Sequence, residues 1–376
     1  MTDSVELRTL AASHRDTGVP QSEFDDYDAS LRGHWGGPSP RHFPQAMQLF
    51  PVRHSKCRGK SALITGGTSG IGFYAAKLLA AIGFTLILPS RPGLEHEAAG
   101  AVSAIKAAVP DATVLVPTVG LDLASFRSVR EFGAHLRAER STYRRIDALL
   151  LNAGRGGGVH DTHDTTEDGH EAIMQVNLYS HALLASELLP LLADSPYARI
   201  CLHSSSARFN AHPSQLDDLK SSEVRLHPWA TYSLSKAAMC PLARALNVRL
   251  AGAGVTGAAC VADPGLAATG VNVQHELARS IGHGGGTKQL HDEAAVHAAD
   301  GALPLVLAAL EGKPNEMYRG DGRHASSVES AAFSETRQTR HAGSDPYAWG
   351  TRRVETLAAQ LGSITGWKWP RSKHEL

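Results

Sequence analysis

The sequence has few cysteines and no net charge, and each of these shortages excludes a class of protein. Four cysteines are scattered through 376 residues without a Cys-x-x-Cys pair, which is poor material for a disulfide framework or a zinc site and favours a reducing compartment. Lys plus Arg and Asp plus Glu each number 37, so the formal charge is zero. No charge surplus points to a nucleic acid or an anionic membrane as partner. We therefore expect a small-molecule partner.

Long apolar runs are also missing from the sequence. No stretch of about 18 apolar residues occurs, so no transmembrane segment is predicted. The first residues are polar and lack the apolar core of a secretory signal. The last four residues, Lys373-His374-Glu375-Leu376, distantly echo an endoplasmic-reticulum retrieval tail, but such a tail is read only in a protein that has entered the secretory path. We expect a cytoplasmic protein.

Composition divides the chain into three regions. Residues 1–55 are rich in His, Pro, Gly, Asp and Arg without a sustained helix or strand period, so we expect an extension that is irregular or wraps the body. We expect residues 56–330 to form the folded domain. Residues 331–376 are a C-terminal extension with a helix, near 349–361, that packs on this domain. The chain shows no internal repeat.

Short apolar runs alternate with helix-like stretches through the middle of the chain. Strands are predicted at 62–64, 85–88, 113–116, 146–151, 199–203, 255–261 and 316–319. Helices are predicted at 71–82, 95–108, 124–139, 168–192, 230–251 and 291–310. Strands that alternate with helices in this way are joined by right-handed crossovers. The pattern predicts an α/β fold, a single Rossmann-type, doubly wound parallel sheet of about seven strands flanked by helices.

A glycine-rich turn follows the first predicted strand and opens a helix. It reads Thr65-Gly66-Gly67-Thr68-Ser69-Gly70-Ile71-Gly72. Glycines there allow a tight turn and close backbone approach to a pyrophosphate, and the helix N-terminus offers N–H groups and partial positive charge. The turn therefore predicts a dinucleotide site, with candidate contacts from Thr65, Gly66, Thr68, Ser69, Gly70, Ile71 and Gly72.

The end of the second predicted strand indicates which dinucleotide binds. It reads Leu88-Pro89-Ser90-Arg91 and lacks the acidic residue that would hydrogen-bond a ribose 2′-hydroxyl and repel a 2′-phosphate. Arg91 can pair with that phosphate, although its other reading is a solvated loop charge. We expect NADP(H) rather than NAD(H).

A tyrosine, a lysine and a serine run supply acid–base chemistry. Tyr232 and Lys236 are four residues apart and hence on one face of the predicted helix 230–251. An adjacent cation favours the phenolate of a tyrosine, whose ordinary pKa is about 10. Residues 204–206 are serines at the end of the strand 199–203, where side chains face the ligand crevice. One of these hydroxyls can hydrogen-bond a carbonyl oxygen that Tyr232 protonates.

These motifs, in this order, resemble the short-chain dehydrogenase/reductase family over about residues 58 to 325. The matches are the turn Thr-Gly-x-x-x-Gly-x-Gly at 65–72, Asp122-Leu123, Asn152-Ala153-Gly154, Asn177, the Ser, Tyr and Lys, and Pro264-Gly265 with Thr269. The long segment between Ser205 and Tyr232 is similar to that of the retinol-dehydrogenase-like and WW-domain-oxidoreductase-like members. The family pattern selects Ser205, with Ser204 and Ser206 left open.

The resemblance implies interconversion of a carbonyl and an alcohol by hydride transfer, with Tyr232 as general acid and base. It gives Lys236 two roles, lowering the pKa of Tyr232 and holding the nicotinamide ribose, while Ser205 orients the carbonyl and Asn177 supports a water relay. Further cofactor contacts are implied at Asp122, Leu123, Asn152, Ala153, Gly154, Pro264, Gly265 and Thr269. Family members often pair through the helices predicted here at 168–192 and 230–251, so a homodimer or tetramer is expected.

Two other functions fit the same motifs. The scaffold also reduces carbon–carbon double bonds with NADPH in some relatives, and a non-catalytic NADPH-binding regulator would share the fold. A metal site is not expected, because His160 with His163, and His291 with His297, give no clean set of three or four ligands. The sequence does not identify the substrate.

Overall fold

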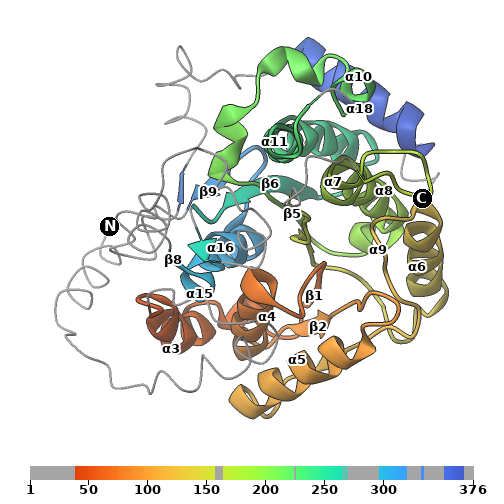
Figure 1. Cartoon of the computed structure of the whole chain (residues 1–376). Helices are drawn as coiled ribbons and strands as arrows, with labels where there is room; N and C mark the ends of the chain where they lie inside the picture. The colour runs from red at the N-terminus through yellow and green to blue at the C-terminus, as the bar shows by residue number, and fades with distance from the viewer. Residues whose placement is uncertain are drawn as a thin grey trace.

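The computed structural model describes residues 39–156, 164–223, 226–265, 267–268, 296–319, 332–333 and 351–367. Its centre is an eight-stranded sheet in the order β10-β9-β6-β5-β4-β1-β2-β3 (Figure 1). Seven strands run parallel: β1 (Ser61–Ile64), β2 (Thr85–Ile87), β3 (Val114–Leu115), β4 (Ala148–Leu151), β5 (Ala198–His203), β6 (Gly257–Asp263) and β9 (Met317–Arg319). β10 (Ala332–Phe333) adds an antiparallel edge. The predicted α/β fold with a Rossmann-type parallel sheet is confirmed.

Helices cover both faces of the sheet and form two apolar cores (Figure 1). One face carries α4 (Gly70–Ile82), α5 (Glu95–Ala108) and α16 (Leu303–Glu311), and the other carries α6 (Phe126–Ala138), α8 (Ser180–Glu187) and α11 (Pro228–Gly252). In β4, Leu149 and Leu151 belong to the core beneath α8 and α11, whereas Leu150 belongs to the core beneath α4. Because both faces of the sheet are buried, successive residues of a strand are apolar instead of alternating between apolar and polar.

The prediction of one long helix over 168–192 is wrong. The segment consists of α7 (Ala172–Met174), a π-helical turn (Gln175–Tyr179), α8, and α9 (Leu189–Ala193). The start is set by Glu171, whose side chain accepts a hydrogen bond from Met174 N at 2.9 Å and so caps the helix. Pro190, near the start of α9, cannot donate a helical N–H, so the helix breaks before it.

The predicted helix over 291–310 is also interrupted. Residues 291–295 lie outside the described chain, and β8 (Val296–His297) pairs with β7 (Ala267–Ala268). α15 (Ala298–Gly301) and α16 follow as separate helices, with Pro304 in the first turn of α16. The remaining predicted strands and helices match the observed ones to within a few residues.

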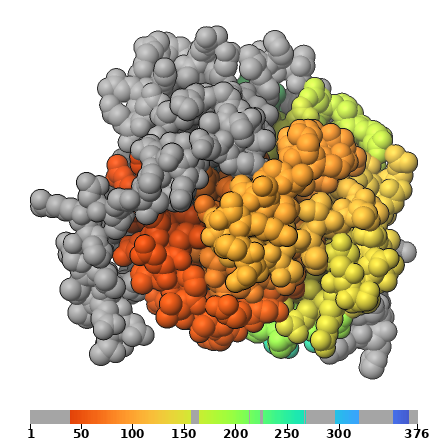
Figure 2. Space-filling model, turned by 90° about the horizontal axis from the view of Figure 1, so that it is seen from below, coloured from red at the N-terminus to blue at the C-terminus, as the bar shows by residue number. Residues whose placement is uncertain are grey.

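The N-terminal extension contains a helix that the sequence analysis did not predict. α3 (Phe43–Arg53) includes Pro44 and Pro51, which hide its helical character. The Asp300 carboxylate accepts hydrogen bonds from the backbone N–H groups of residues 41–43 at 2.7 to 2.9 Å. Phe43 packs edge-to-face on Tyr74 of α4. These contacts dock α3 on the domain. Figure 2 shows this face of the molecule, which consists mainly of the first part of the chain, coloured red to yellow.

The C-terminal helix α18 (Thr351–Thr365) packs on α11, near the predicted position. Its Gln360 accepts from Leu219 N at 2.7 Å and donates to Leu216 O at 3.0 Å. Arg353 forms an ion pair with Asp217. α18 therefore holds the segment that precedes α11. Within the residues described, no helix has the length and apolar character needed to cross a membrane.

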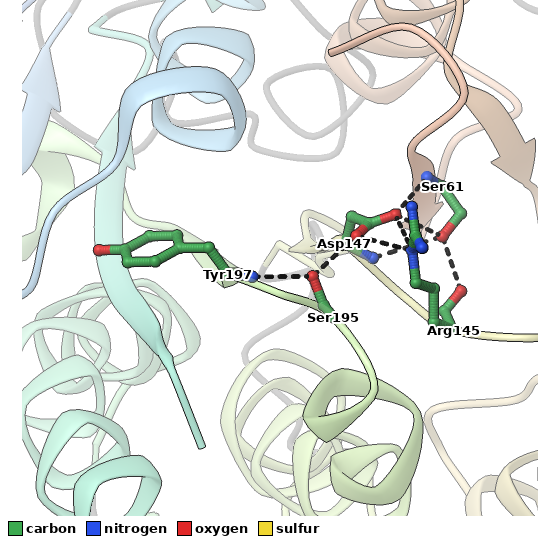
Figure 3. Close-up of polar contacts among 5 residues, drawn as sticks. All are labelled: Ser61, Arg145, Asp147, Ser195 and Tyr197. Atoms are coloured by element: carbon green, nitrogen blue, oxygen red, sulfur yellow. Dashed lines mark hydrogen bonds and ion pairs between the residues drawn. The ribbon is translucent and has the colours of Figure 1, made fainter. Parts of the chain in front are cut away.

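A polar cluster joins the amino ends of the central strands (Figure 3). The Asp147 carboxylate is 3% exposed and accepts hydrogen bonds from Ser61 N at 2.9 Å and from Ser195 Oγ at 2.7 Å. Arg145 Nε lies 3.0 Å from the same carboxylate. Since the buried charge is paired and hydrogen-bonded, it fixes β1 beside β4 without leaving an unpaired group. The loops at the opposite, carboxyl edge are then free to carry a site.

Candidate active site

The glycine turn between β1 and α4 has a backbone that only glycine accommodates at key positions. Gly66 has φ +64° and Gly70 has φ +50°. A Cβ on Gly72 would come within 2.1 Å of Gly66 O. Ser69 is the N-cap of α4, and its side chain makes no capping hydrogen bond. The turn thus presents a close backbone and a helix N-terminus, which suits a pyrophosphate.

Thr65 and Asn152 hold this turn against the loop after β4. Thr65 Oγ1 accepts hydrogen bonds from Asn152 N at 2.9 Å and Ala153 N at 3.0 Å. Asn152 Nδ2 donates to Thr65 O at 2.9 Å. Gly154 continues the loop, and a Cβ there would lie 3.3 Å from Lys236 Nζ. These residues therefore bring the dinucleotide turn next to Lys236.

The structure brings Ser205, Tyr232 and Lys236 together. Lys236 Nζ lies 5.7 Å from the centroid of the Tyr232 ring and donates to His203 O at 3.1 Å. Ser205 forms a side-chain hydrogen bond with Tyr232. Ser204 is buried and donates to Lys236 O at 2.7 Å. Of these two serines, Ser205 is thus the one directed at the phenol.

Burial dominates the titration of the central pair. Burial, opposed by the hydrogen bond from Ser205 and aided by the Asp263 carboxylate, raises the pKa of Tyr232 to about 12. Burial also lowers the pKa of Lys236 to about 8, with Asp263 opposing. Desolvation penalises the phenolate, so the pKa of Tyr232 in the chain alone lies above its ordinary value. That Lys236 lowers this pKa stays a prediction.

Asn177 lies in the π-helical turn with its side chain fully engaged. Its Oδ1 accepts from Arg155 N at 2.7 Å, and its Nδ2 donates to Ser235 Oγ at 3.0 Å. Its backbone carbonyl accepts from His181 Nδ1 at 3.0 Å. Asn177 thus ties the π-helical turn to α11, and its part in a water relay stays a prediction.

Three polar residues of the site were missed by sequence reasoning. His181 bridges Asn177 O to Thr65 Oγ1, the latter at 3.1 Å. Arg208 forms an ion pair with Asp263, both side chains being buried. The available signals were weak: a histidine one helical turn after Asn177, and an Asp at the end of a strand before Pro264.

The other predicted contacts are distributed around the carboxyl edge of the sheet. Arg91 follows β2 with an exposed side chain. Asp122 Oδ1 accepts from Ala124 N at 2.9 Å and so stabilises its own turn. Leu123 O accepts from Ser180 Oγ at 2.6 Å. Gly265, next to Pro264, has φ +74°, while Thr269 lies outside the described residues.

Of the four histidines considered as metal ligands, His297 lies within the described residues. His160, His163 and His291 lie outside the described residues. His297 accepts a hydrogen bond from Ala299 N at 3.1 Å, which caps α15. Among the residues the structure covers, no group of three or more His, Cys, Asp or Glu side chains could hold a metal ion.

Known proteins resemble part of this chain in sequence and resemble its fold. A family model described as short chain dehydrogenase matches residues 60–217. Retinol dehydrogenase 13 of Homo sapiens is 37% identical over 229 residues, covering 61% of this chain and 63% of that protein. The chain thus matches less than two thirds of that relative's length.

Two solved structures show the likeness in fold. A protein from Mycobacterium paratuberculosis has a TM-score of 0.58 at 24% identity, covering 84% of this chain and 96% of that one. A short chain dehydrogenase from Escherichia coli CFT073, complexed with NADPH, has a TM-score of 0.51 at 22% identity, covering 70% of this chain and 97% of that one.

Proposed function

We propose that this chain, which matches the short chain dehydrogenase family model over residues 60–217, is an NADP(H)-dependent oxidoreductase that interconverts an alcohol and a carbonyl. The observation that carries the proposal is the hydrogen bond between Ser205 and Tyr232, one helical turn from Lys236. The glycine turn at Gly66 to Gly72 lies beside them through the contacts of Asn152. A proton donor and a dinucleotide cradle are thus adjacent.

Each residue has a role in this reaction. The nicotinamide of a dinucleotide whose pyrophosphate is bound at the glycine turn would supply the hydride. Tyr232 passes a proton to the substrate oxygen during reduction and takes it back during oxidation, while Ser205 donates a hydrogen bond to the same oxygen. The Lys236 ammonium stabilises the phenolate that forms when the proton leaves. Asn177 holds Ser235 and so fixes the helix turn that carries Tyr232 and Lys236.

The dinucleotide is held by backbone and by a few side chains. The turn from Thr65 to Gly72 and the N-terminus of α4 bind the pyrophosphate. The remaining contacts come from Asp122, Leu123, Asn152, Ala153, Gly154, Lys236, Pro264, Gly265 and Thr269. The preference for NADP(H) rests on Arg91 and on the lack of an acid in residues 88–91. The Escherichia coli protein of similar fold, solved with NADPH, supports this choice.

The substrate side of Tyr232 is apolar. Ile173 and Ala207 pack with Tyr232 in one cluster. Trp229 stacks on the Tyr232 ring with centroids 5.5 Å apart and planes 25° apart. An alcohol or carbonyl on an apolar skeleton suits this surface better than a charged one.

The test is consumption of NADPH across a panel of apolar and polar ketones, aldehydes, quinones and enones. Tyr232→Phe keeps the ring that packs with Trp229 and removes only the hydroxyl, so turnover should fall by about a hundredfold or more. Tyr197→Phe is the matched control, since Tyr197 lies at the amino end of β5, away from the site. Full activity in Tyr232→Phe would refute the mechanism, and turnover confined to enones would favour double-bond reduction.

Cofactor choice is tested separately. Arg91→Glu places an acid where a 2′-phosphate is proposed to bind, so affinity should move from NADPH towards NADH. Arg144→Glu, on a loop outside the site, controls for the change in net charge. An unchanged NADPH to NADH ratio in Arg91→Glu would contradict the assignment of Arg91.

A further inference from the structure

A buried ion pair lies directly behind the proposed catalytic centre. Arg208 belongs to the short helix η3 (Ser206–Asn210) that follows Ser205, and Asp263 is the last residue of β6. Their side chains are 3% and 1% exposed. Burying two charges is costly unless both are hydrogen-bonded, and the activity proposed above assigns this pair no role.

The pair connects the two loops that border the site. Arg208 Nη1 donates to Ser205 O at 2.9 Å as well as to the Asp263 carboxylate. Asp263 Oδ1 accepts from Gly265 N at 2.9 Å. One nitrogen, Nη1, makes both contacts, and its N–H bonds have fixed directions in the guanidinium plane. Movement of either residue would shift both Ser205 and the Gly265 turn.

We propose that Arg208 and Asp263 are positioning residues. The pair fixes Ser205 relative to the Gly265 turn, and its net charge determines the electrostatic field at Tyr232 and Lys236. This inference rests on the proposed function of that site. It assigns a role in the reaction to two residues that touch neither the substrate oxygen nor the proton in transit.

The Asp263 carboxylate acts on both Tyr232 and Lys236. The groups facing Lys236 are Asp263 from β6, His203 from β5 and His181 from α8. Burial lowers the pKa of His203 and His181 to about 3, so both are neutral near pH 7. The Asp263 carboxylate raises the pKa of Lys236 and of Tyr232. Arg208 opposes that field by pairing with Asp263.

Removing each partner should therefore act in opposite directions. Asp263→Asn keeps an oxygen for Gly265 N but removes the negative charge, so the pKa of Lys236 should fall by about one unit. Arg208→Met leaves the carboxylate unpaired, so the pKa of Lys236 should rise by a similar amount. The double variant carries neither charge and should lie between the two. Both single variants leave a buried charge unpaired and should also lose stability.

The measurement is a carbon-13 NMR titration of labelled lysine side chains in the full chain without dinucleotide. The Lys236 resonance is assigned by its loss in Lys236→Met. Asp147→Asn is the control, since Asp147 is a buried carboxylate paired with Arg145 at the opposite edge of the sheet. It should lose stability without moving the titration. Opposite shifts in the two single variants support the proposal, and shifts of the same sign, or none, overturn it.

A conservative variant separates geometry from charge. Arg208→Lys keeps a cation beside Asp263 but replaces the planar guanidinium, whose Nη1 also donates to Ser205 O, with a shorter side chain that lacks those fixed N–H directions. It should titrate like the wild type while kcat falls about tenfold with little change in KM. Wild-type kcat in this variant would refute the role in holding Ser205. If Tyr232→Phe retains full turnover, the proposed function fails, whereas the Lys236 titration still reports on the pair because it requires no turnover.

Discussion

His203 Nδ1 lies 2.8 Å from Asn152 Oδ1, and this contact joins the carboxyl ends of β5 and β4. Because Asn152 Nδ2 donates to Thr65 O, its Oδ1 is the acceptor and His203 Nδ1 carries the proton. The backbone carbonyl of His203 accepts from Lys236 Nζ at 3.1 Å. One buried histidine therefore links the support of the glycine turn to the lysine of the proposed catalytic centre.

Replacing His203 should weaken dinucleotide binding. His203→Ala removes the donor that orients the Asn152 amide, which leaves a buried acceptor unpaired at a cost of about 1 kcal/mol. NADPH affinity should fall about fivefold, measured by fluorescence titration. His96→Ala, on an exposed position of α5, should bind like the wild type. Wild-type affinity in a folded His203→Ala protein would contradict the role of this contact.

The two buried histidines should make the protein sensitive to mild acid. Burial lowers the pKa of His181 and of His203 from 6.5 to about 3. Between these pH values the unfolded chain binds more protons than the folded one, so their stabilising effect is complete above pH 6.5 and declines as the pH falls towards 3. Each histidine should contribute a slope of about 1.4 kcal/mol per pH unit in that window.

Urea unfolding between pH 4 and 8 measures this slope. A His181→Gln variant should be less stable at pH 8 but should lose less stability on acidification, since glutamine does not titrate. A slope equal to that of the wild type would show that other groups cause the acid sensitivity.

The glycine turn should tolerate no methyl group at Gly72. A Cβ there would lie 2.1 Å from Gly66 O and 2.5 Å from Asn152 Nδ2, so Gly72→Ala must displace backbone. We expect loss of NADPH binding and a destabilisation of about 2 kcal/mol. Gly252→Ala is the matched control, because a Cβ there meets nothing within 4 Å and alanine favours the helix end of α11. Thermal unfolding and NADPH titration measure both variants. Equal unfolding temperatures and equal NADPH affinities would show that the turn accommodates a methyl group at Gly72.

The fold was predictable because its signals are local and repeated. Short apolar runs alternate with helical stretches, and right-handed crossovers between such strands give a doubly wound parallel sheet. The late start of the helix at Ala172 and the helix α3 were not predicted, because a side-chain cap at Glu171 and prolines within α3 run against the wider pattern. Glu171 and Pro44 act through tertiary position, which periodicity does not report.

The residues of the proposed site could be predicted where a motif fixes their spacing in the sequence. They could not be predicted where two residues from different strands meet only in the folded chain. Tyr232 and Lys236 follow from one helix face, and Gly66 to Gly72 follow from one turn. Arg208 and Asp263 are far apart in the sequence and meet only because β5 and β6 are neighbours. The cytoplasmic location and the pairing of two copies stay predictions.

Trp229 should determine how well the site accepts an apolar substrate. Its ring stacks on Tyr232, and its backbone N donates to His227 Nδ1 at 3.2 Å, which fixes the first turn of α11. We expect the indole ring also to contact an apolar substrate, so Trp229→Ala should remove about 1 kcal/mol of binding free energy. KM for an apolar ketone should therefore rise about fivefold, with little change for a small polar aldehyde.

The conservative variant decides whether the ring itself matters. Trp229→Phe retains an aromatic face against Tyr232, so its KM for the apolar ketone should stay within about twofold of the wild type. Steady-state kinetics of both variants give KM for the apolar ketone and for the polar aldehyde, and the two KM changes are compared. If Trp229→Ala raised KM equally for the apolar and the polar compound, the indole would act by holding α11 in place, and its contact with substrate would have to be abandoned.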